Sequence, residues 1–175
     1  NINKKTKILA VGRLEKWKGF DVLLHSLKYI KNSFEINVLI LGDGPEKENL
    51  NKIINENDLG NIVKLEGYVE NPYPFYKNAD IFVLSSFVEG MPNVLVEAMI
   101  FGCTPVSTNC ATGPSEIIND GINGYLCRVG DEVELSKKIV LAINKKIDKK
   151  ILYAKALEFS ESEILNKYFN LLKLY

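Results

Sequence analysis

The stretch IFVLSSFVEGMPNVLVEAMIFG, from Ile81 to Gly102, shows the repeating unit of the fold. It begins with a short apolar run, passes through a loop with glycine and proline, and continues as an apolar segment of helical length. Strands of a parallel sheet are buried on both faces and are continuously apolar, as IFVL is. The runs ILAV (8–11) and INVLIL (36–41) repeat this feature. Alternating strands and helices of this kind predict a doubly wound α/β fold with a parallel sheet.

Six strands are expected along the chain, and the sixth has the weakest pattern. They are Lys7–Gly12, Glu35–Gly42, Ile62–Glu66, Ile81–Ser85, Thr104–Thr108 and Gly124–Leu126. Helices are expected at Gly19–Ile30, Pro45–Asn57, Pro72–Asn78, Asn93–Phe101, Pro114–Asn119 and Asp131–Asn144. After residue 143 the pattern is helical only, which predicts extra C-terminal helices over Ile151–Phe159 and Ser160–Tyr175.

The composition fits one globular domain over residues 1–175, with 46% hydrophobic and 25% charged residues. Basic and acidic residues balance at 22 each, so no net charge attracts nucleic acid or an anionic membrane. The three cysteines, Cys103, Cys110 and Cys127, lack metal-ligand spacing, which favours a reducing, cytoplasmic compartment. We see no signal-peptide pattern and no apolar run of roughly 18 residues. Because the first residue is Asn1, we expect a piece of a longer protein.

A lysine-rich segment lies near the C-terminus. Seven lysines fall between Lys137 and Lys155, where Asp148 is the single acidic residue. A solvated helical face is the favoured interpretation, and a docking surface for anionic lipid is the alternative.

The loop after the first strand, GRLEKWKGF, carries two permanent cations. Gly12 permits a tight turn, and Arg13 and Lys18 stand just before a helix N-terminus. Ligands of an open parallel sheet bind beyond the carboxyl ends of the strands, where these residues fall. Fixed cations beside free backbone N–H groups suit a diphosphate. The alternative is that both are ordinary surface charges.

The next two loops contain glycine and aromatic residues. In GDGPEKENL, Gly42 and Gly44 allow close backbone approach, but neither a dinucleotide fingerprint nor a P-loop is present. In EGYVENPYPFYKNAD, Tyr68 and Val69 could cover a flat base. Core or turn packing is the competing interpretation of these aromatic residues.

The loop and helix after the fourth strand place two carboxylates near one crevice. Glu89 is in the loop, Gly90 and Pro92 shape the turn, and Asn93 is expected to cap a helix carrying Glu97. On one continuous helix, residues eight apart would differ by about 80° in direction, whereas a loop and a helix let both point inward. Carboxylates accept strong hydrogen bonds from sugar hydroxyls, and the helix amides between them favour an anion.

The remaining polar residues give no catalytic set. In STNCATGPSEI, Glu116 is expected at a helix N-terminus rather than on a ligand. His25, the single histidine, lies among leucines of the first helix and is expected to be a packed or exposed helical residue. No Ser/His/Asp arrangement supports nucleophilic hydrolysis, and we expect no metal site.

Several of these stretches together resemble the C-terminal domain of family four, or group 1, retaining glycosyltransferases. Glu89 and Glu97 match the E-x7-E pattern of that family. VGRLEKWKGFDVLLHSL, LILGDGPEKENL, VKLEGYVEN, YKNADIFVLSSFVEGMPNVLVEAMIFGCTPVST and GPSEIINDGINGYL resemble it in the same order. The resemblance covers about residues 5–145 and is specific as a combination.

The resemblance implies the Rossmann-like, nucleotide-sugar-binding half of a GT-B enzyme, which transfers a hexose with retention and needs no metal or other cofactor. A UDP-sugar is the expected donor, and a glycan or lipid-linked molecule the expected acceptor. An acceptor-binding N-terminal domain would be missing from this chain, and the isolated domain would be inactive. Peripheral membrane contact by the full-length protein is left open, and no nucleic acid partner is expected.

The same resemblance assigns roles to individual residues. Arg13 and Lys18 would hold the diphosphate, Glu97 the ribose hydroxyls, and Glu89 the donor hexose. The segment Gly90–Val94 would supply amides to the sugar and phosphate. Glu89, Arg13 and Lys18 are the expected catalytic residues, and the full expected donor set is Gly12, Arg13, Lys18, Gly44, Tyr68, Val69, Glu89, Gly90, Met91, Pro92, Asn93, Val94 and Glu97.

Two other functions stay open. One is the half-domain of a related phosphorylase or sugar epimerase, which would also be an enzyme. The other is a module that binds a nucleotide sugar without transferring it.

Overall fold

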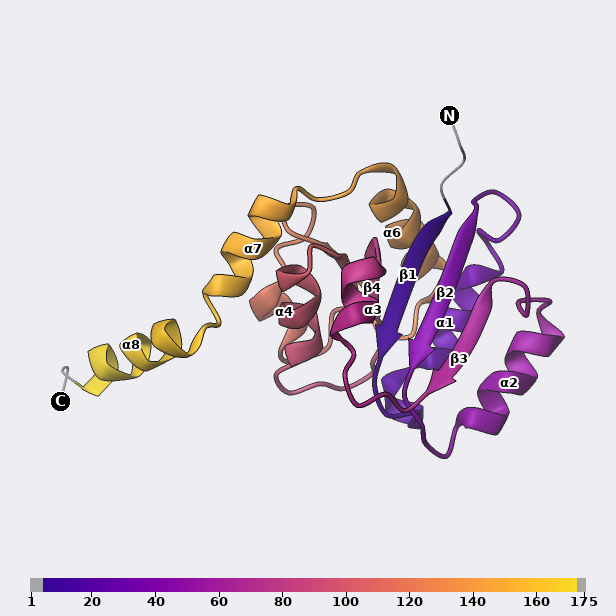
Figure 1. Ribbon diagram of the computed structural model, residues 1–175, viewed down its shortest axis with the longest axis horizontal. Coiled ribbons are helices and arrows are strands. Elements are labelled where there is room, and N and C mark those ends of the chain that lie inside the picture. Colours follow the sequence, from indigo (N-terminus) through magenta and orange to yellow (C-terminus); the bar gives the residue numbers. More distant parts are fainter. Residues whose placement is uncertain (1–4, 173–175) are drawn as a thin grey trace.

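The computed structural model describes residues 5–172, with side chains up to residue 166, and contains a six-stranded parallel sheet (Figure 1). The strands are β1 (Thr6–Val11), β2 (Ile36–Leu41), β3 (Val63–Gly67), β4 (Ile81–Leu84), β5 (Thr104–Thr108) and β6 (Tyr125–Cys127). Their order is β3-β2-β1-β4-β5-β6. The winding direction reverses between β1 and β4, so the loops that follow these two strands are neighbours. The prediction of a doubly wound parallel sheet is confirmed.

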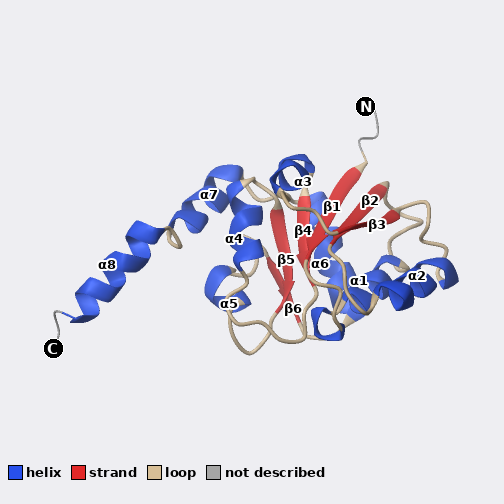
Figure 2. Cartoon of the chain, turned by 60° about the horizontal axis from the view of Figure 1, so that its bottom comes forward, coloured by secondary structure: helices blue, strands red, loops and turns tan. Residues whose placement is uncertain are grey.

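Helices cover both faces of the sheet (Figure 2). On one face, α1 (Phe20–Leu27) packs against α2 (Lys47–Glu56) and α6 (Glu132–Asn144). On the other, α4 (Asn93–Ile100) contacts α5 (Pro114–Ile117) and α7 (Lys149–Leu157), while α3 (Tyr73–Asn78) packs near β1. This division follows from right-handed crossovers, which change face where the winding direction reverses.

The predicted elements are all present in the described residues, with small shifts at their ends; residues 173–175 of the helix predicted over Ser160–Tyr175 lie outside the described residues. A short 3-10 turn, η1 (Lys16–Lys18), comes before α1 and was not predicted. The first helix starts at Phe20 rather than Gly19, because Gly19 adopts a left-handed conformation with φ 61°. It ends at Leu27, three residues before the predicted end, and β6 begins one residue later than expected.

The core follows the middle strands. Every residue of β4 and β5 is buried, whereas β3, at the sheet edge, alternates buried and exposed residues. The largest fully buried side chains include Tyr76 of α3 and Phe82 of β4, whose ring centroids lie 5.5 Å apart. Burying one large apolar side chain contributes about 1.5–3 kcal/mol, so these strands hold the loops at their carboxyl ends in place.

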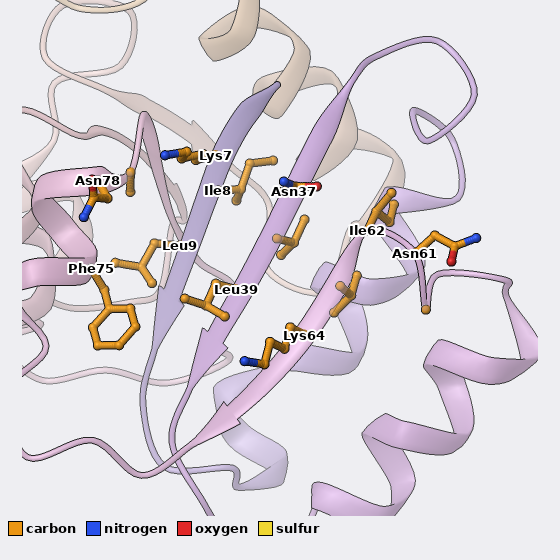
Figure 3. Close-up of a pocket in the computed structure, with 14 residues that line it drawn as sticks. Lys7, Ile8, Leu9, Asn37, Leu39, Asn61, Ile62, Lys64, Phe75 and Asn78 are labelled. Carbon is orange, nitrogen blue, oxygen red and sulfur yellow. The ribbon is translucent and has the colours of Figure 1, made fainter. Parts of the chain in front are cut away.

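Because α3 is short, part of one sheet face stays uncovered, as Figure 3 shows. A groove of about 370 Å³ runs over β1, β2 and β3 beside α3. Leu9, Leu39 and Phe75 contribute apolar side chains to it, and Lys7 and Lys64 lie along it. We call it the face groove.

The C-terminal helices leave the sheet. In Figure 1, α8 (Glu161–Leu172) continues from α7 away from the strands. Three lysines of the lysine-rich segment are in ion pairs: Lys138 with Asp120, Lys146 with Asp80, and Lys155 with Glu158. Within residues 5–172, no helix combines the length and hydropathy needed to cross a bilayer.

Candidate functional site

The loops after β1 and β4 touch at the carboxyl edge of the sheet. The Phe87 amide donates to the Trp17 carbonyl at 2.7 Å, and the Ser85 hydroxyl donates to the Lys18 carbonyl at 3.1 Å. A Cβ on Gly19 would lie 2.1 Å from the Ser85 carbonyl oxygen, so a side chain there would separate the loops. The fold therefore brings the first and fourth predicted loops into direct contact.

That contact pairs two predicted site residues with each other. Lys18 Nζ lies 2.7 Å from Glu89 Oε1, and the Ser86 hydroxyl donates to the same oxygen at 2.6 Å. The side chains of Lys18 and Glu89 are only 22% and 10% exposed, so solvent screens this ion pair weakly. Both bonds use Oε1, which leaves Oε2 able to accept from a hydroxyl.

The loop after β5 holds the Glu89 loop from the other side. The Thr112 hydroxyl donates to the Glu89 carbonyl at 2.7 Å, and the Thr108 hydroxyl donates to the Ser86 carbonyl at 2.6 Å. A Cβ on Gly113 would lie 2.1 Å from the Gly90 carbonyl oxygen. Three loops thus fix the backbone around Glu89, which suits a side chain that must orient a ligand.

The start of α4 corrects one expectation and supports another. Asn93 does not cap the helix, because Pro92, with ψ 80°, is the N-cap. Asn93 is the first residue of the helix, and its side chain is exposed. No side chain bonds to the first-turn amides. In the described part of the chain, the N–H groups of Gly90, Met91 and Val94 find no acceptor. Such amides, at the positive end of a helix dipole, favour an anion.

Glu97 differs from Glu89 in having no charged partner. Its side chain is partly exposed, and it forms no ion pair or hydrogen bond of ordinary geometry with any described residue. The buried Tyr76 hydroxyl interacts electrostatically with it.

A hollow of about 420 Å³ opens at the ends of β1, β2 and β3, and we call it the edge hollow. It is lined by Val11, Gly12, Arg13, Leu41, Gly42, Asp43, Tyr68, Val69 and Pro72. The predicted residues Gly12, Arg13, Tyr68 and Val69 are thus brought together. A Cβ on Gly12 would lie 3.8 Å from Lys18 Cδ, so the Lys18 stem runs beside this hollow.

The two predicted residues at its mouth are open to solvent. Arg13 is 73% exposed, and its Nε lies 3.0 Å from Glu15 Oε1. Tyr68 is 78% exposed, so the competing interpretation of this residue as core packing is wrong. An exposed aromatic ring beside a hollow is a surface on which a flat base can stack.

Glycines after β2 let the backbones of two loops meet. A Cβ on Gly42 would lie 1.8 Å from the Gly12 carbonyl oxygen, and one on Gly44 would lie 2.5 Å from that of Leu14. Gly44 does not line the edge hollow, and its contact with a donor stays a prediction. Asp43, which lines the hollow, was not predicted from the sequence. Its carboxylate accepts from the Gly44 amide and Lys47 Nζ, and bonding to Lys47 lowers its pKa.

Other reactive groups lie away from this edge or are inert. Glu116 accepts from the Gly113 amide at the start of α5, as predicted for a helix N-terminal acid. Burial raises the pKa of the thiols of Cys103 and Cys127 to about 12, so neither is a thiolate at neutral pH. Among residues 5–172, no three His, Cys, Asp or Glu side chains are grouped as metal ligands would be.

Known proteins resemble this chain in sequence. The sequence model for glycosyl transferases group 1 matches residues 1–159. The GalNAc-alpha-(1->4)-GalNAc-alpha-(1->3)-diNAcBac-PP-undecaprenol alpha-1,4-N-acetyl-D-galactosaminyltransferase of Campylobacter jejuni is 32% identical over 146 residues, which are 82% of this chain and 40% of that protein. The chain spans 29–40% of the length of three curated relatives that it matches.

Solved structures show the same fold. The apo form of the lipopolysaccharide outer core galactosyltransferase WaaB superposes with a TM-score of 0.89 at 24% identity, over 98% of this chain and 50% of that chain. The pneumococcal O-GlcNAc transferase GtfA, in complex with UDP and GlcNAc, superposes with a TM-score of 0.84 at 25% identity, over 98% of this chain and 36% of that chain. The fold is that of the C-terminal half of GT-B glycosyltransferases. With the family model matching most of its length, the chain belongs to the glycosyl transferases of group 1.

Proposed function

We propose that this chain is the donor-binding domain of a retaining, metal-independent glycosyltransferase. The full protein would transfer a hexose from a nucleoside diphosphate sugar to a glycan or lipid-linked acceptor. The observation that carries the proposal is the meeting of Arg13, Lys18, Glu89 and the free amides just before and at the start of α4 at one edge of the sheet. UDP is the proposed nucleotide because the GtfA structure contains it.

Each part of the donor has a matching surface. The edge hollow, with Tyr68 at its mouth, would hold the base, and Glu97 would accept hydrogen bonds from the ribose hydroxyls. The two cations and the amides of Gly90 and Met91 would bind the diphosphate. Glu89, oriented by Lys18 and Ser86, would accept a hydroxyl of the hexose.

Catalysis would then be mainly electrostatic. When the bond between the sugar and the diphosphate breaks, negative charge collects on the leaving phosphate oxygens. Preorganised cations and amides stabilise this charge without needing to rearrange, and removing one such donor typically costs about 3–4 kcal/mol. Lys18 is already held in place by Glu89, so its position is set before the donor arrives.

A binding panel tests this proposal. Uridine, guanosine and adenosine diphosphates and their common sugars would each be titrated into the domain in a calorimeter, with EDTA present. We expect one nucleoside diphosphate to bind, with the others at least tenfold weaker. Absence of binding by every member would contradict the proposal, and so would equal binding by the free nucleosides.

Transfer by the full-length protein separates an enzyme from a binding module. We expect labelled sugar to reach an acceptor and Glu89→Ala to abolish the transfer, while the isolated domain binds donor without transferring it. Donor binding with no transfer to any glycan or lipid-linked acceptor would favour the non-enzymatic module. We also propose a cytoplasmic site of action, supported by the unpaired cysteines, with peripheral membrane contact through the full protein.

A further inference from the structure

Tyr76 is the one tyrosine of the described core whose buried hydroxyl makes no hydrogen bond of ordinary geometry. The residue is fully buried on α3, and its hydroxyl oxygen finds no hydrogen-bond partner within residues 5–172. An unsatisfied buried hydroxyl costs about 1–3 kcal/mol, so such a group in a native core calls for an explanation. Phenylalanine would fill the same space without this cost.

The packing around Tyr76 places it against the side of α4 that carries Glu97. Its ring stacks on Phe101, with centroids 5.8 Å apart and planes 9° apart. Phe101 follows Glu97 by four residues, so the two side chains lie one above the other on the helix. Helix side chains lean toward the N-terminus, so the Phe101 ring, and with it the stacked Tyr76 ring, lies toward Glu97.

The electrostatics of the pair agree with this placement. Burial raises the pKa of the Tyr76 hydroxyl far above its ordinary value, and the charge of Glu97 raises it further. The hydroxyl therefore stays protonated across the physiological range and can only be a donor toward the carboxylate. Glu97 meanwhile has no cation or other described donor to fix its rotamer.

We propose that Tyr76 is a positioning residue for Glu97, donating its hydroxyl hydrogen to the carboxylate when that carboxylate binds the ribose of the donor. The inference rests on the proposed function, in which Glu97 accepts the ribose hydroxyls. One carboxylate oxygen would take the Tyr76 bond, and the remaining lone pairs would face the vicinal diol. A residue buried in the core would thus set the affinity for one part of the ligand without touching it.

The test compares Tyr76→Phe with Tyr73→Phe. Tyr73 lies on the same helix and its ring is 5.4 Å from that of Phe101, but it is 51% exposed. Both changes remove one hydroxyl and keep the ring. Affinities for UDP and for 2′,3′-dideoxy-UDP, which lacks the diol, would be measured by calorimetry for the parent and both variants, along with melting temperatures of the empty domains.

We expect Tyr76→Phe to weaken UDP binding about 5- to 10-fold and to leave the affinity for 2′,3′-dideoxy-UDP unchanged. The empty variant should melt at a temperature no lower than that of the parent. Tyr73→Phe should change neither affinity. Equal losses for both nucleotides, or no loss for either, would overturn the inference while leaving the proposed function standing, provided that the parent binds UDP. A parent that binds neither nucleotide would overturn the proposed function, and the inference with it.

Discussion

The edge hollow and the face groove are alike in size, at about 420 and 370 Å³, yet different parts of the chain form them. Strand side chains line the face groove, including Leu9 and Leu39, which point out of the same sheet face (Figure 3). The edge hollow is lined largely by residues beyond the strand ends, such as Gly12, Arg13 and Gly42. Volume alone therefore does not identify a ligand site. The edge hollow has Arg13 in its lining and the Lys18 stem beside it, at the edge where the loops after β1 and β4 meet, whereas Lys7 and Lys64 of the face groove lie on strands.

The strongest test of this contrast uses one glycine from each region. Gly42 lines the edge hollow at φ 142° and its Cβ would collide with the Gly12 carbonyl, whereas nothing lies within 4 Å of a Cβ on Gly60, which lines the face groove. We expect Gly42→Ala to lower the free energy of unfolding by about 2–3 kcal/mol. Gly60→Ala should be neutral or raise it by about 0.4–1 kcal/mol. Urea denaturation measures both free energies of unfolding. Equal losses for the two variants would contradict the distinction between the close-packed backbone at the edge hollow and the open backbone at Gly60.

The next prediction removes one cation at a time. Arg13→Ala and Lys18→Ala should each weaken nucleoside diphosphate binding by about 1–3 kcal/mol, or roughly 5- to 150-fold in Kd, because a charge-assisted contact is lost. Binding of the nucleoside without phosphate should hardly change. Calorimetry with UDP and uridine measures the difference.

Lys64→Ala is the matched control, since Lys64 is an exposed lysine of the face groove paired only with Glu66 among described residues. It should leave UDP binding as in the parent. If Lys64→Ala weakens UDP binding as much as Lys18→Ala does, the assignment of the phosphate to the edge hollow is contradicted. If the cation variants affect uridine and UDP equally, their role is not with the phosphate.

Local patterns in the sequence predicted the strands, the doubly wound parallel sheet and the loops in which the candidate site lies. Apolar runs such as IFVL and glycines after strands act over a few residues, so their consequences can be read locally. The Lys18–Glu89 pair joins residues 71 apart, and the Tyr76–Glu97 contact joins two helices. Such pairings depend on how the helices and strands pack against one another, and the periodicity of apolar residues in the sequence does not reveal this packing. The prediction of Asn93 as the cap was wrong because the helix begins at Asn93 itself, and Pro92, with ψ 80°, is the last residue outside helical geometry.

A smaller effect is expected for Glu97→Gln. The empty domain should be about as stable as the parent, because the carboxylate has no described ion-pair partner to lose. At 100 times its Kd, UDP should stabilise the parent by about 2.7 kcal/mol, a melting shift of about 5–10 °C. The variant should shift clearly less at that concentration, since an amide accepts weaker hydrogen bonds. An empty domain weakened by about 1–3 kcal/mol with full ligand affinity would instead identify Glu97 as structural.

The smallest expected effect is that of a chelator. If Arg13, Lys18 and the α4 amides neutralise the diphosphate, EDTA should leave the Kd for UDP and for a UDP-sugar unchanged. Titrations with EDTA, and then with magnesium or manganese restored, measure this. A Kd that collapses with EDTA and recovers with metal would contradict the metal-independent proposal.

The most direct test of the donor site is to map UDP binding on the backbone amides by two-dimensional NMR of the ¹⁵N-labelled domain. Amides around the edge hollow and the start of α4, those of Gly12, Val69, Gly90 and Met91, should shift as UDP is added. Amides of the face groove, those of Asn37, Asn61 and Lys64, should stay in place. Shifts confined to the face groove, or an unchanged spectrum at millimolar UDP, would contradict the assignment of the donor site to this edge of the sheet.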